Sequence, residues 1–317
     1  MDLTAKDLLN GDRRTLAKLI TEVENGSPKA RRILRQIYGK TGKAVVVGFT
    51  GPLGVGKSSL INKLLQHLRA KGKKVGVIAI DPSSPFSGGA VLGDRVRLER
   101  PEGDMTSFVR SMATRGHVGG VAQGTRDVIR LMEAFGMDVV IVETVGSGQA
   151  DVDIRDIATT RVVVLVPHLG DDVQSLKAGL FEIADVFVVN KSDLAGASEA
   201  ARHLKEMVTI MAPRDGWKPM VVESSTLDSS GVDELWTAVS RHEVSMKMSH
   251  LFEKEARERL EKEVRELARE HVEARLGRLV ERDAEGKIIV EQVINGKTDP
   301  YTGSERLVAR LTKEKIG

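Results

Sequence analysis

Eight consecutive residues have the types and spacing that bind nucleoside phosphates. They are Gly51, Pro52, Leu53, Gly54, Val55, Gly56, Lys57 and Ser58, and Ser59 follows them. In this pattern glycines let backbone amides turn inward around phosphates, the lysine reaches the terminal phosphates, and the hydroxyl ligates magnesium. An apolar run precedes the loop and a helical pattern, residues 59–68, follows it, which is the context that this chemistry requires. We therefore expect this loop to bind a nucleoside triphosphate.

A second group of residues indicates which base is bound. Asn190, Lys191 and Asp193 directly follow the apolar run Val186–Val189. The carboxylate of Asp193 would accept hydrogen bonds from the ring NH and the exocyclic amine of guanine, and adenine would leave this buried acceptor unsatisfied. Where GTPases place the loop that contacts the guanine carbonyl, the sequence has Ser225, Thr226 and Leu227. The expected ligand is GTP or GDP.

Acidic residues between these two motifs are the expected partners of a magnesium ion. Glu143 ends one apolar run, Asp81 closes another, and Asp94 follows a Gly-Gly stretch. With the Ser58 hydroxyl, these carboxylates supply the oxygen ligands that magnesium prefers. Gly146 would offer its backbone amide to the γ-phosphate.

Hydrolysis is expected to be slow in the absence of a partner. In small GTPases a glutamine directly follows the glycine that contacts the γ-phosphate, but here Ser147 stands in that place and Gln149 comes later. Lys57, Glu143 and Gln149 are the catalytic candidates. A switch protein with slow turnover needs a partner, so we expect a protein to be the target of regulation.

Composition limits the classes of protein to consider. The 317 residues are 41% hydrophobic and 29% charged, enough to bury a full core. Because the chain has 48 basic and 45 acidic residues, its formal net charge is only +3, and nucleic-acid binding is not expected. The chain has no cysteine, and its seven histidines are scattered, so a zinc site is not expected. Without a leader-like or membrane-length apolar run, the expected location is cytoplasmic and no membrane contact is expected.

A parallel sheet is the element that must position these loops. The chain has continuous apolar runs, each followed by a helical segment, as in strands covered on both faces. The runs are residues 44–49, 75–80, 139–142, 162–166, 186–189 and 220–222. This pattern predicts an α/β fold with a doubly wound, mostly parallel sheet. The expected divisions are an N-terminal helical segment at residues 1–42, a P-loop GTPase domain at 43–243, and a C-terminal helical arm and tail at 244–317.

The C-terminal arm carries apolar residues at roughly helical spacing. They are Leu260, Val264, Leu267, Val272, Leu276 and Leu279. This stripe either packs back on the core or forms a dimerisation arm, and the sequence leaves both open. The tail after Asp283 has two turn-like sequences, Asn295-Gly296 and Asp299-Pro300-Tyr301.

Several longer motifs resemble the MeaB/ArgK family of P-loop GTPases over most of the chain. Beyond the phosphate and guanine motifs, the resemblance rests on residues 81–89, 92–95, 117–120, 143–149 and 170–174. The first of these, Asp-Pro-Ser-Ser-Pro-Phe-Ser-Gly-Gly, is the most specific. The resemblance implies a P-loop fold of the SIMIBI type, in the group of GTPases that includes metallochaperones.

What the family does goes beyond what spacing indicates. Its members hydrolyse GTP, form homodimers through C-terminal helices, and bind methylmalonyl-CoA mutase or a related mutase. They gate the delivery of adenosylcobalamin and eject damaged cofactor. The resemblance therefore implies magnesium and GTP or GDP as ligands, no tightly bound cobalamin on this chain, and an adenosyltransferase as a further candidate partner. It also implies that Asp171, Gln174 and Lys177 couple the nucleotide state to the mutase.

Three other functions remain as alternatives. A kinase or ATPase serving a basic amino-acid transport system would place labelled phosphate on a binding protein, but no kinase catalytic loop is present. A nickel metallochaperone GTPase would need a cysteine or histidine cluster. A nucleotide-sensing scaffold would show no rise in turnover when its partner is added.

Overall fold

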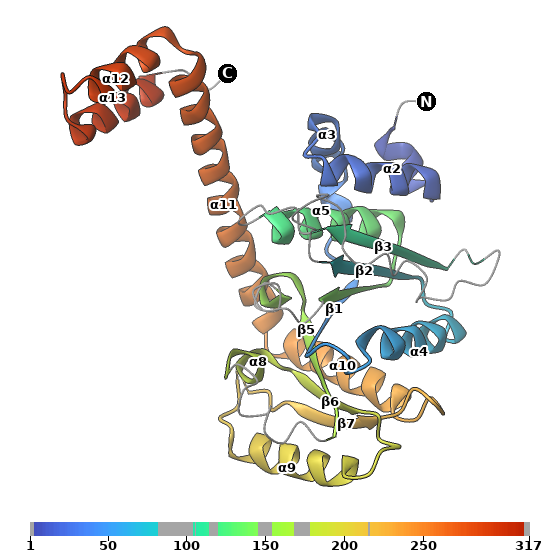
Figure 1. The fold of residues 1–317 in the computed structure, drawn as a ribbon. Helices are drawn as coiled ribbons and strands as arrows, with labels where there is room; N and C mark the ends of the chain where they lie inside the picture. Colours follow the sequence, from blue (N-terminus) through green and yellow to red (C-terminus); the bar gives the residue numbers. More distant parts are fainter. Residues whose placement is uncertain are drawn as a thin grey trace. The chain divides into compact units, whose positions relative to one another are not determined.

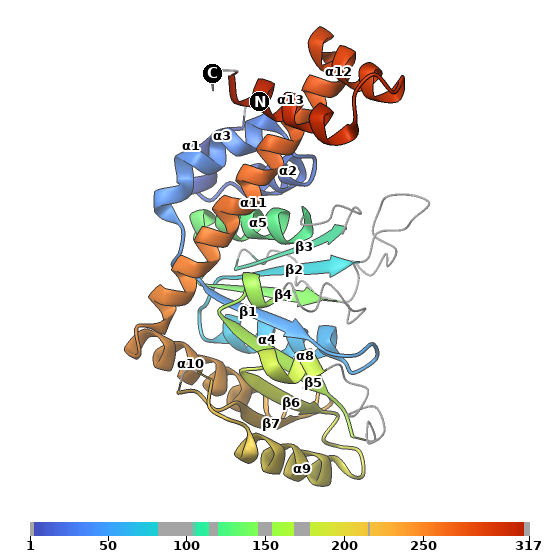
Figure 2. The same cartoon turned by 90° about the vertical axis from the view of Figure 1, so that its left-hand side faces the viewer.

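The computed structural model describes residues 3–81, 104, 106–113, 120–144, 154–167, 178–214 and 216–313. The chain divides into two compact units, Met1–Glu253 and Lys254–Gly317. The first unit is a sheet with helices on both faces, and the second is made of helices (Figures 1 and 2).

Within the described residues, the first unit is built on a seven-stranded parallel sheet. Its strands are β1 (Val45–Thr50), β2 (Val75–Asp81), β3 (Ser107–Ala113), β4 (Val139–Thr144), β5 (Thr160–Leu165), β6 (Val186–Asn190) and β7 (Met220–Ser224). Their order is β3-β2-β4-β1-β5-β6-β7, and all pairs are parallel. Every residue of β4, β5 and β6 is buried. The predicted doubly wound α/β fold is confirmed.

Helices cover both faces because alternate residues of each strand point in opposite directions. On one face lie α4 (Lys57–Ala70) and α10 (Val232–Met248). The other face carries α5 (Gly120–Phe135), α8 (Ala178–Ile183) and α9 (Ala197–Ile210). Within β5, Val162 and Val164 pack with α4 and α10, whereas Val163 and Leu165 pack with α9.

The N-terminal helices share a core with the sheet. They are α1 (Ala5–Leu9), α2 (Arg13–Glu24) and α3 (Pro28–Ile37), followed by the short 3₁₀ helix η1 (Tyr38–Lys40). Their inward side chains pack against α5 and are fully or almost fully buried; these are Leu8, Leu16, Leu19, Ile20, Ile33 and Ile37. Together with α5 they form the outer layer over β2, β3 and β4 (Figure 2).

The sequence prediction missed the strand β3, which lies at an edge of the sheet. Three of its seven side chains, Ser107, Arg110 and Ser111, are polar, so it has no long continuous apolar run. Helix α2 contacts the strand from far away in sequence: Glu24 pairs with Arg110, and the Arg13 guanidinium lies 5.5 Å from the centre of the Phe108 ring. Arg13 also donates to the Ser107 carbonyl at 2.6 Å. Tertiary contacts therefore stabilise a strand that local pattern does not reveal.

The second unit contains two helices that the sequence prediction did not assign. The long helix α11 (Leu251–Arg282) is followed by α12 (Ala284–Ile294) and α13 (Pro300–Lys313). Asp283 caps α12 by accepting from Gly286 N at 2.9 Å, and it also pairs with Arg310 of α13. A Cβ at Gly286 would lie 2.0 Å from the Leu279 carbonyl oxygen. Glycine is therefore required where the start of α12 packs against the end of α11. None of the described helices is long and apolar enough to cross a membrane.

The predicted stripe on α11 is two shorter patches. The five-residue step from Leu267 to Val272 rotates the direction of the side chain by about 140° on an α-helix. Leu260 and Val264, in the first patch, are 41% and 64% exposed, whereas Leu279, in the second, is buried next to Gly286. The first patch is therefore uncovered, and Val272, at the start of the second patch, is also 52% exposed.

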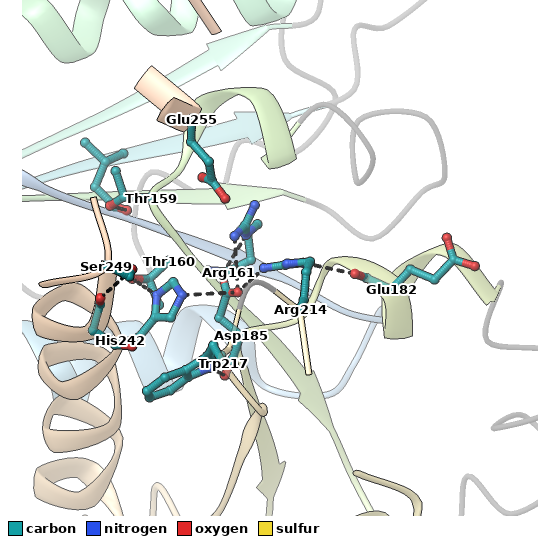
Figure 3. Close-up of polar contacts among 12 residues, drawn as sticks. Thr159, Thr160, Arg161, Glu182, Asp185, Arg214, Trp217, His242, Ser249 and Glu255 are labelled. Carbon is teal, nitrogen blue, oxygen red and sulfur yellow. Dashed lines mark hydrogen bonds and ion pairs between the residues drawn. The ribbon is translucent and has the colours of Figure 1, made fainter. Parts of the chain in front are cut away.

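At the amino-terminal ends of β5 and β6, a buried ion cluster joins several elements. Arg161, Arg214 and His242 all converge on the Asp185 carboxylate (Figure 3). Arg161 Nε donates to Asp185 Oδ2 at 2.6 Å and Nη2 to Oδ1 at 3.1 Å, and both residues are almost completely buried. Trp217 Nε1 donates to the Asp185 carbonyl at 3.0 Å. Removal of one partner from such a buried pair typically costs about 3–5 kcal/mol, so we expect the cluster to fix the start of both strands.

The surroundings of His242 in this cluster disfavour its protonated form. Burial lowers the pKa of His242 below its ordinary value of 6.5, and Arg161 and Arg214 lower it further, while Asp185 acts in the opposite direction. Thr160 Oγ1 lies 2.9 Å from His242 Nδ1. A lowered pKa means that the unfolded chain binds more protons than the folded chain when the pH falls below about 6.5.

The cluster therefore predicts a pH dependence of stability. Between about pH 7.5 and pH 5.5, the free energy of unfolding should decrease, because the lowered pKa of His242 makes the folded chain bind this proton more weakly than the unfolded chain. Urea unfolding of wild type and His242→Gln at both pH values measures this, and the variant should show the smaller decrease. The exposed His203 provides the matched control, His203→Gln, which should retain the wild-type decrease. An equal decrease in all three proteins would contradict this role of His242.

Candidate nucleotide site

The carboxyl ends of four strands on the same edge of the sheet, two on either side of β5, bring the predicted motifs together. The P-loop follows β1, Glu143 is in β4, Asn190 ends β6, and Ser224 ends β7. Asn190 and Ser224 are direct partners in the β6–β7 ladder. The ends of parallel strands are where doubly wound sheets bind ligands.

Backbone geometry explains why glycine is needed in the P-loop. Gly51 and Gly56 have φ values of 140° and 89°, which L side chains rarely adopt. A Cβ at Gly51 would lie 2.2 Å from the Val164 carbonyl oxygen of β5, and a Cβ at Gly56 would lie 2.6 Å from Asn190 Nδ2. The loop is therefore held close to β5 and to the end of β6.

Lys57, at the first turn of α4, is directed back over the P-loop. Its Nζ donates to the carbonyls of Gly51 at 2.6 Å and Pro52 at 2.9 Å, and the residue is 6% exposed. The helix begins at Lys57, two residues earlier than the sequence pattern indicated. The ammonium group therefore lies inside the loop whose amides are suited to phosphate.

Ser58 and Glu143 form the described part of the predicted magnesium site. Ser58 Oγ donates to Glu143 Oε1 at 2.6 Å, and Glu143 is 9% exposed. A hydroxyl and a carboxylate are hard oxygen donors, so this pair fits magnesium. Within the described residues, no three or more His, Cys, Asp or Glu side chains lie close enough together to hold a metal ion. Asp94 and the side chain of Asp81 lie outside the described part of the chain.

Asn190 joins the P-loop to the end of β7. Its Nδ2 donates to the Val55 carbonyl at 2.8 Å, and its Oδ1 accepts from Ser224 Oγ at 3.1 Å. Asn190 is 1% exposed and Ser224 is fully buried, so both contacts are shielded from water. Lys191 adopts a left-handed backbone, with φ 59°, and its Nζ donates to the Gly54 carbonyl at 3.0 Å.

Asp193 is connected to the loop after β7. Ser225 Oγ donates to Asp193 Oδ1 at 2.5 Å, and the same hydroxyl accepts from Leu227 N at 3.3 Å. The segment that would read guanine and the segment that would contact its carbonyl therefore form one unit. Thr226, which lies between Ser225 and Leu227 in the sequence, is partly exposed.

Sequence reasoning missed two features of this site. The Val164 carbonyl fits against Gly51, but a backbone atom leaves no signal in residue type. Leu194 directly follows Asp193 and is 45% exposed. With Leu53 and Leu227, which are 68% and 79% exposed, it adds apolar surface to the three loops joined by these hydrogen bonds.

Several predicted site residues lie outside the described part of the chain. They are Asp94, Gly146, Gln149, Asp171, Gln174 and Lys177. Their roles remain predictions.

Comparison with known proteins finds the same family, the MeaB/ArgK GTPases, over most of the chain. The family model for "Methylmalonyl Co-A mutase-associated GTPase MeaB" matches residues 16–280. A "Putative GTPase" of Pyrococcus abyssi is 44% identical over 320 residues, which cover 100% of this chain and 97% of that protein. "GTPase ArgK" of Escherichia coli is 38% identical over 240 residues, 73% of this chain and 72% of that protein. The crystal structure of "LAO/AO transport system kinase" has a TM-score of 0.71 and 28% identity, covering 98% of this chain and 96% of that chain.

The position of Asp193 predicts the base preference and how to change it. Asp193→Asn should weaken GTP binding by about ten- to a hundredfold, because a charged hydrogen-bond acceptor for the guanine NH groups is lost. Binding of xanthosine triphosphate should improve, since its base carries a carbonyl to which the new amide donates. Competition against a fluorescent GDP analogue measures both affinities.

Asp228→Asn is the matched control, because Asp228 is an exposed acid next to the same loop. This variant should bind GTP as the wild type does. Unchanged GTP affinity in Asp193→Asn would refute the guanine assignment.

Proposed function

Because the chain belongs to the family of methylmalonyl-CoA mutase-associated GTPases, we propose that it hydrolyses GTP to gate adenosylcobalamin delivery to a cobalamin-dependent acyl-CoA mutase. In the same role it protects the mutase or restores its activity. The structural observation that carries the proposal is the joined site, in which Asn190 and Lys191 contact the P-loop and Asp193 contacts Ser225. This arrangement supports a site that takes both the phosphates and the guanine of one nucleotide.

The proposed hydrolysis relies mainly on positioning and charge. Lys57 would move from the loop carbonyls to the terminal phosphates, where its charge stabilises the transition state. Bound magnesium would supply further positive charge at the phosphates, held by Ser58 and Glu143, with Asp81 and Asp94 as further proposed ligands. Gln149 is the proposed residue for orienting the attacking water.

Partner control is proposed to act through residues 170–177, which contain Asp171, Gln174 and Lys177. This segment lies between β5 and α8 in the chain. The end of α8 is fixed, because Arg214 Nη1 donates to the Glu182 carbonyl at 3.0 Å while Nη2 pairs with Asp185. The segment leads in the chain directly to α8, whose last turn is held by Arg214, and we propose that it passes a change at the nucleotide to a bound partner.

The uncovered patch on α11 supports a homodimer through the C-terminal helices. Leu260 and Val264 expose apolar surface one turn apart on a helix whose other positions are mostly charged. Apolar patches of this kind are typical of protein interfaces. We propose that a second copy covers this patch.

The alternatives have less support. The related crystal structure carries the name of a transport system kinase, yet the chain has no kinase catalytic loop. Labelled phosphate on a binding protein, rather than in solution, would favour that alternative. A nickel chaperone would need soft or imidazole ligands, and the chain has no cysteine.

The first experiment is phosphate release from GTP and from ATP, with and without a cobalamin-dependent acyl-CoA mutase of the same organism. Turnover should be slow, selective for GTP, and severalfold faster with the mutase. Lys57→Ala is the control for contaminating enzymes. It should abolish GTP turnover, and any turnover that remained in this variant would come from a contaminant. Lys177→Ala should bind GTP normally but lose the stimulation by mutase.

The outcomes separate the nucleotide from the partner. Selective GTP turnover that no mutase changes would remove the chaperone function and leave the GTPase. Equal turnover of ATP would contradict the guanine assignment itself.

The dimer is tested by sedimentation velocity. Leu260→Glu combined with Val264→Glu should convert a dimer to a monomer, because two charges would be buried without partners. Val244→Glu is the control, since Val244 is an exposed valine of α10 at 54% exposure. A dimer that persists in the double variant, or a monomeric wild type, would contradict this interface.

A further inference from the structure

A basic face lies on α3 and the turn that follows it. We use this name for Arg31, Arg32, Arg35, Lys40 and Lys43, all of which are exposed. The segment from residue 28 to residue 44 contains no Asp or Glu. Because the whole chain has a formal charge of only +3, this short segment carries a disproportionate share of positive charge.

The described part of the chain provides no internal partner for these charges, because none of the five forms an ion pair there. Glu133 of α5 lies against this segment, but its oxygens accept from Gly42 N at 2.9 Å and Ala44 N at 3.2 Å. On α11, by contrast, basic residues pair with acids one turn away, as in Arg257 with Glu261 and Arg259 with Glu255.

Folding gains little from this distribution of charge, because only Arg35, in the last turn of α3, lies where positive charge favours the helix dipole. The first turn of α3 has no acidic residue, although negative charge there would favour the helix dipole. Arg31 and Arg35 lie one turn apart, where like charges destabilise a helix. The helix forms because Ser27 caps it, with Lys29 N donating to Ser27 Oγ at 3.2 Å, and because its inner face is buried. Because these exposed charges do little to stabilise the fold, we expect them to bind another molecule.

We propose that the basic face docks an acidic protein surface. Arginine presents planar pairs of donors that match carboxylates, and three of the five residues are arginine. A membrane surface fits less well, because the apolar residues Ile33 and Ile37 of α3 are buried and unavailable for insertion. A nucleic acid also fits less well, since the ten-residue helix α3 spans only about 15 Å, short for a stable set of phosphate contacts.

This inference deepens the proposed function and rests on it for one point, that the acidic surface belongs to the mutase. Exposed charges at the rim of an interface act mainly on the rate of encounter and make that rate depend on salt. The basic face would therefore speed the association of this GTPase with its partner.

The test compares two triple variants that remove the same charge. One is Arg31→Ala with Arg32→Ala and Arg35→Ala; the control is Arg202→Ala with Arg241→Ala and Lys247→Ala, exposed residues of α9 and α10. At low salt the first variant should associate with the mutase about tenfold more slowly than wild type, and the control should change by less than about twofold. The difference should shrink at high salt, and basal GTP hydrolysis should be unchanged in both.

A second measurement does not depend on the mutase. Wild type and control should bind a polyglutamate peptide at low salt, and the first variant should lose this binding. If wild type binds polyglutamate but no mutase, the proposed function fails and the docking face stands. If the first variant retains wild-type association with both mutase and polyglutamate, the docking face is wrong. If instead these arginines bind heparin or phosphatidylserine vesicles and not polyglutamate, the surface serves another class of partner and the proposal is overturned.

Discussion

The side chain of Asn190 is the contact on which the nucleotide site depends. It donates to the P-loop at Val55 and accepts from Ser224, its partner in the β6–β7 ladder, with almost no exposure to water. Gly56 has to be glycine partly because this amide lies so close. Since a buried amide that loses one partner is costly, the loop for phosphate and the loop for the base are fixed relative to each other. The two halves of the site form as one structure.

The strands that carry this site are also fixed at their other ends. Asp185 directly precedes β6 and binds Arg161 of β5 and Arg214 of the loop before β7. The ion cluster and the guanine-reading loop thus lie at opposite ends of the same strand, β6, about five residues or 17 Å apart. A strand held at both ends keeps its register, because a slip of one residue would break both sets of contacts.

The sequence predicted the parts of the fold whose signal is local. Strands buried on both faces have continuous apolar runs, so the central strands were recognisable, and the P-loop is recognised from its glycines and lysine. The strand β3 was missed because its contacts come from far away in sequence, where Glu24 pairs with Arg110 and Arg13 donates to the Ser107 carbonyl. On α11 a five-residue step split what looked like one stripe. In the site, Gly51 fits against the backbone carbonyl of Val164. Every residue type has such a carbonyl, so the sequence gives no sign of this contact.

The N-terminal helices have a consequence for how this protein can be shortened. Their six large apolar side chains pack on α5, and Arg13 and Glu24 hold the edge strand β3. A chain that began at β1 would keep every residue of the P-loop and guanine motifs, yet it would uncover this whole layer of the core. Such a fragment would carry a broad apolar surface next to a frayed sheet edge, a combination that favours aggregation. The smallest soluble form of the GTPase therefore includes its first forty residues or so.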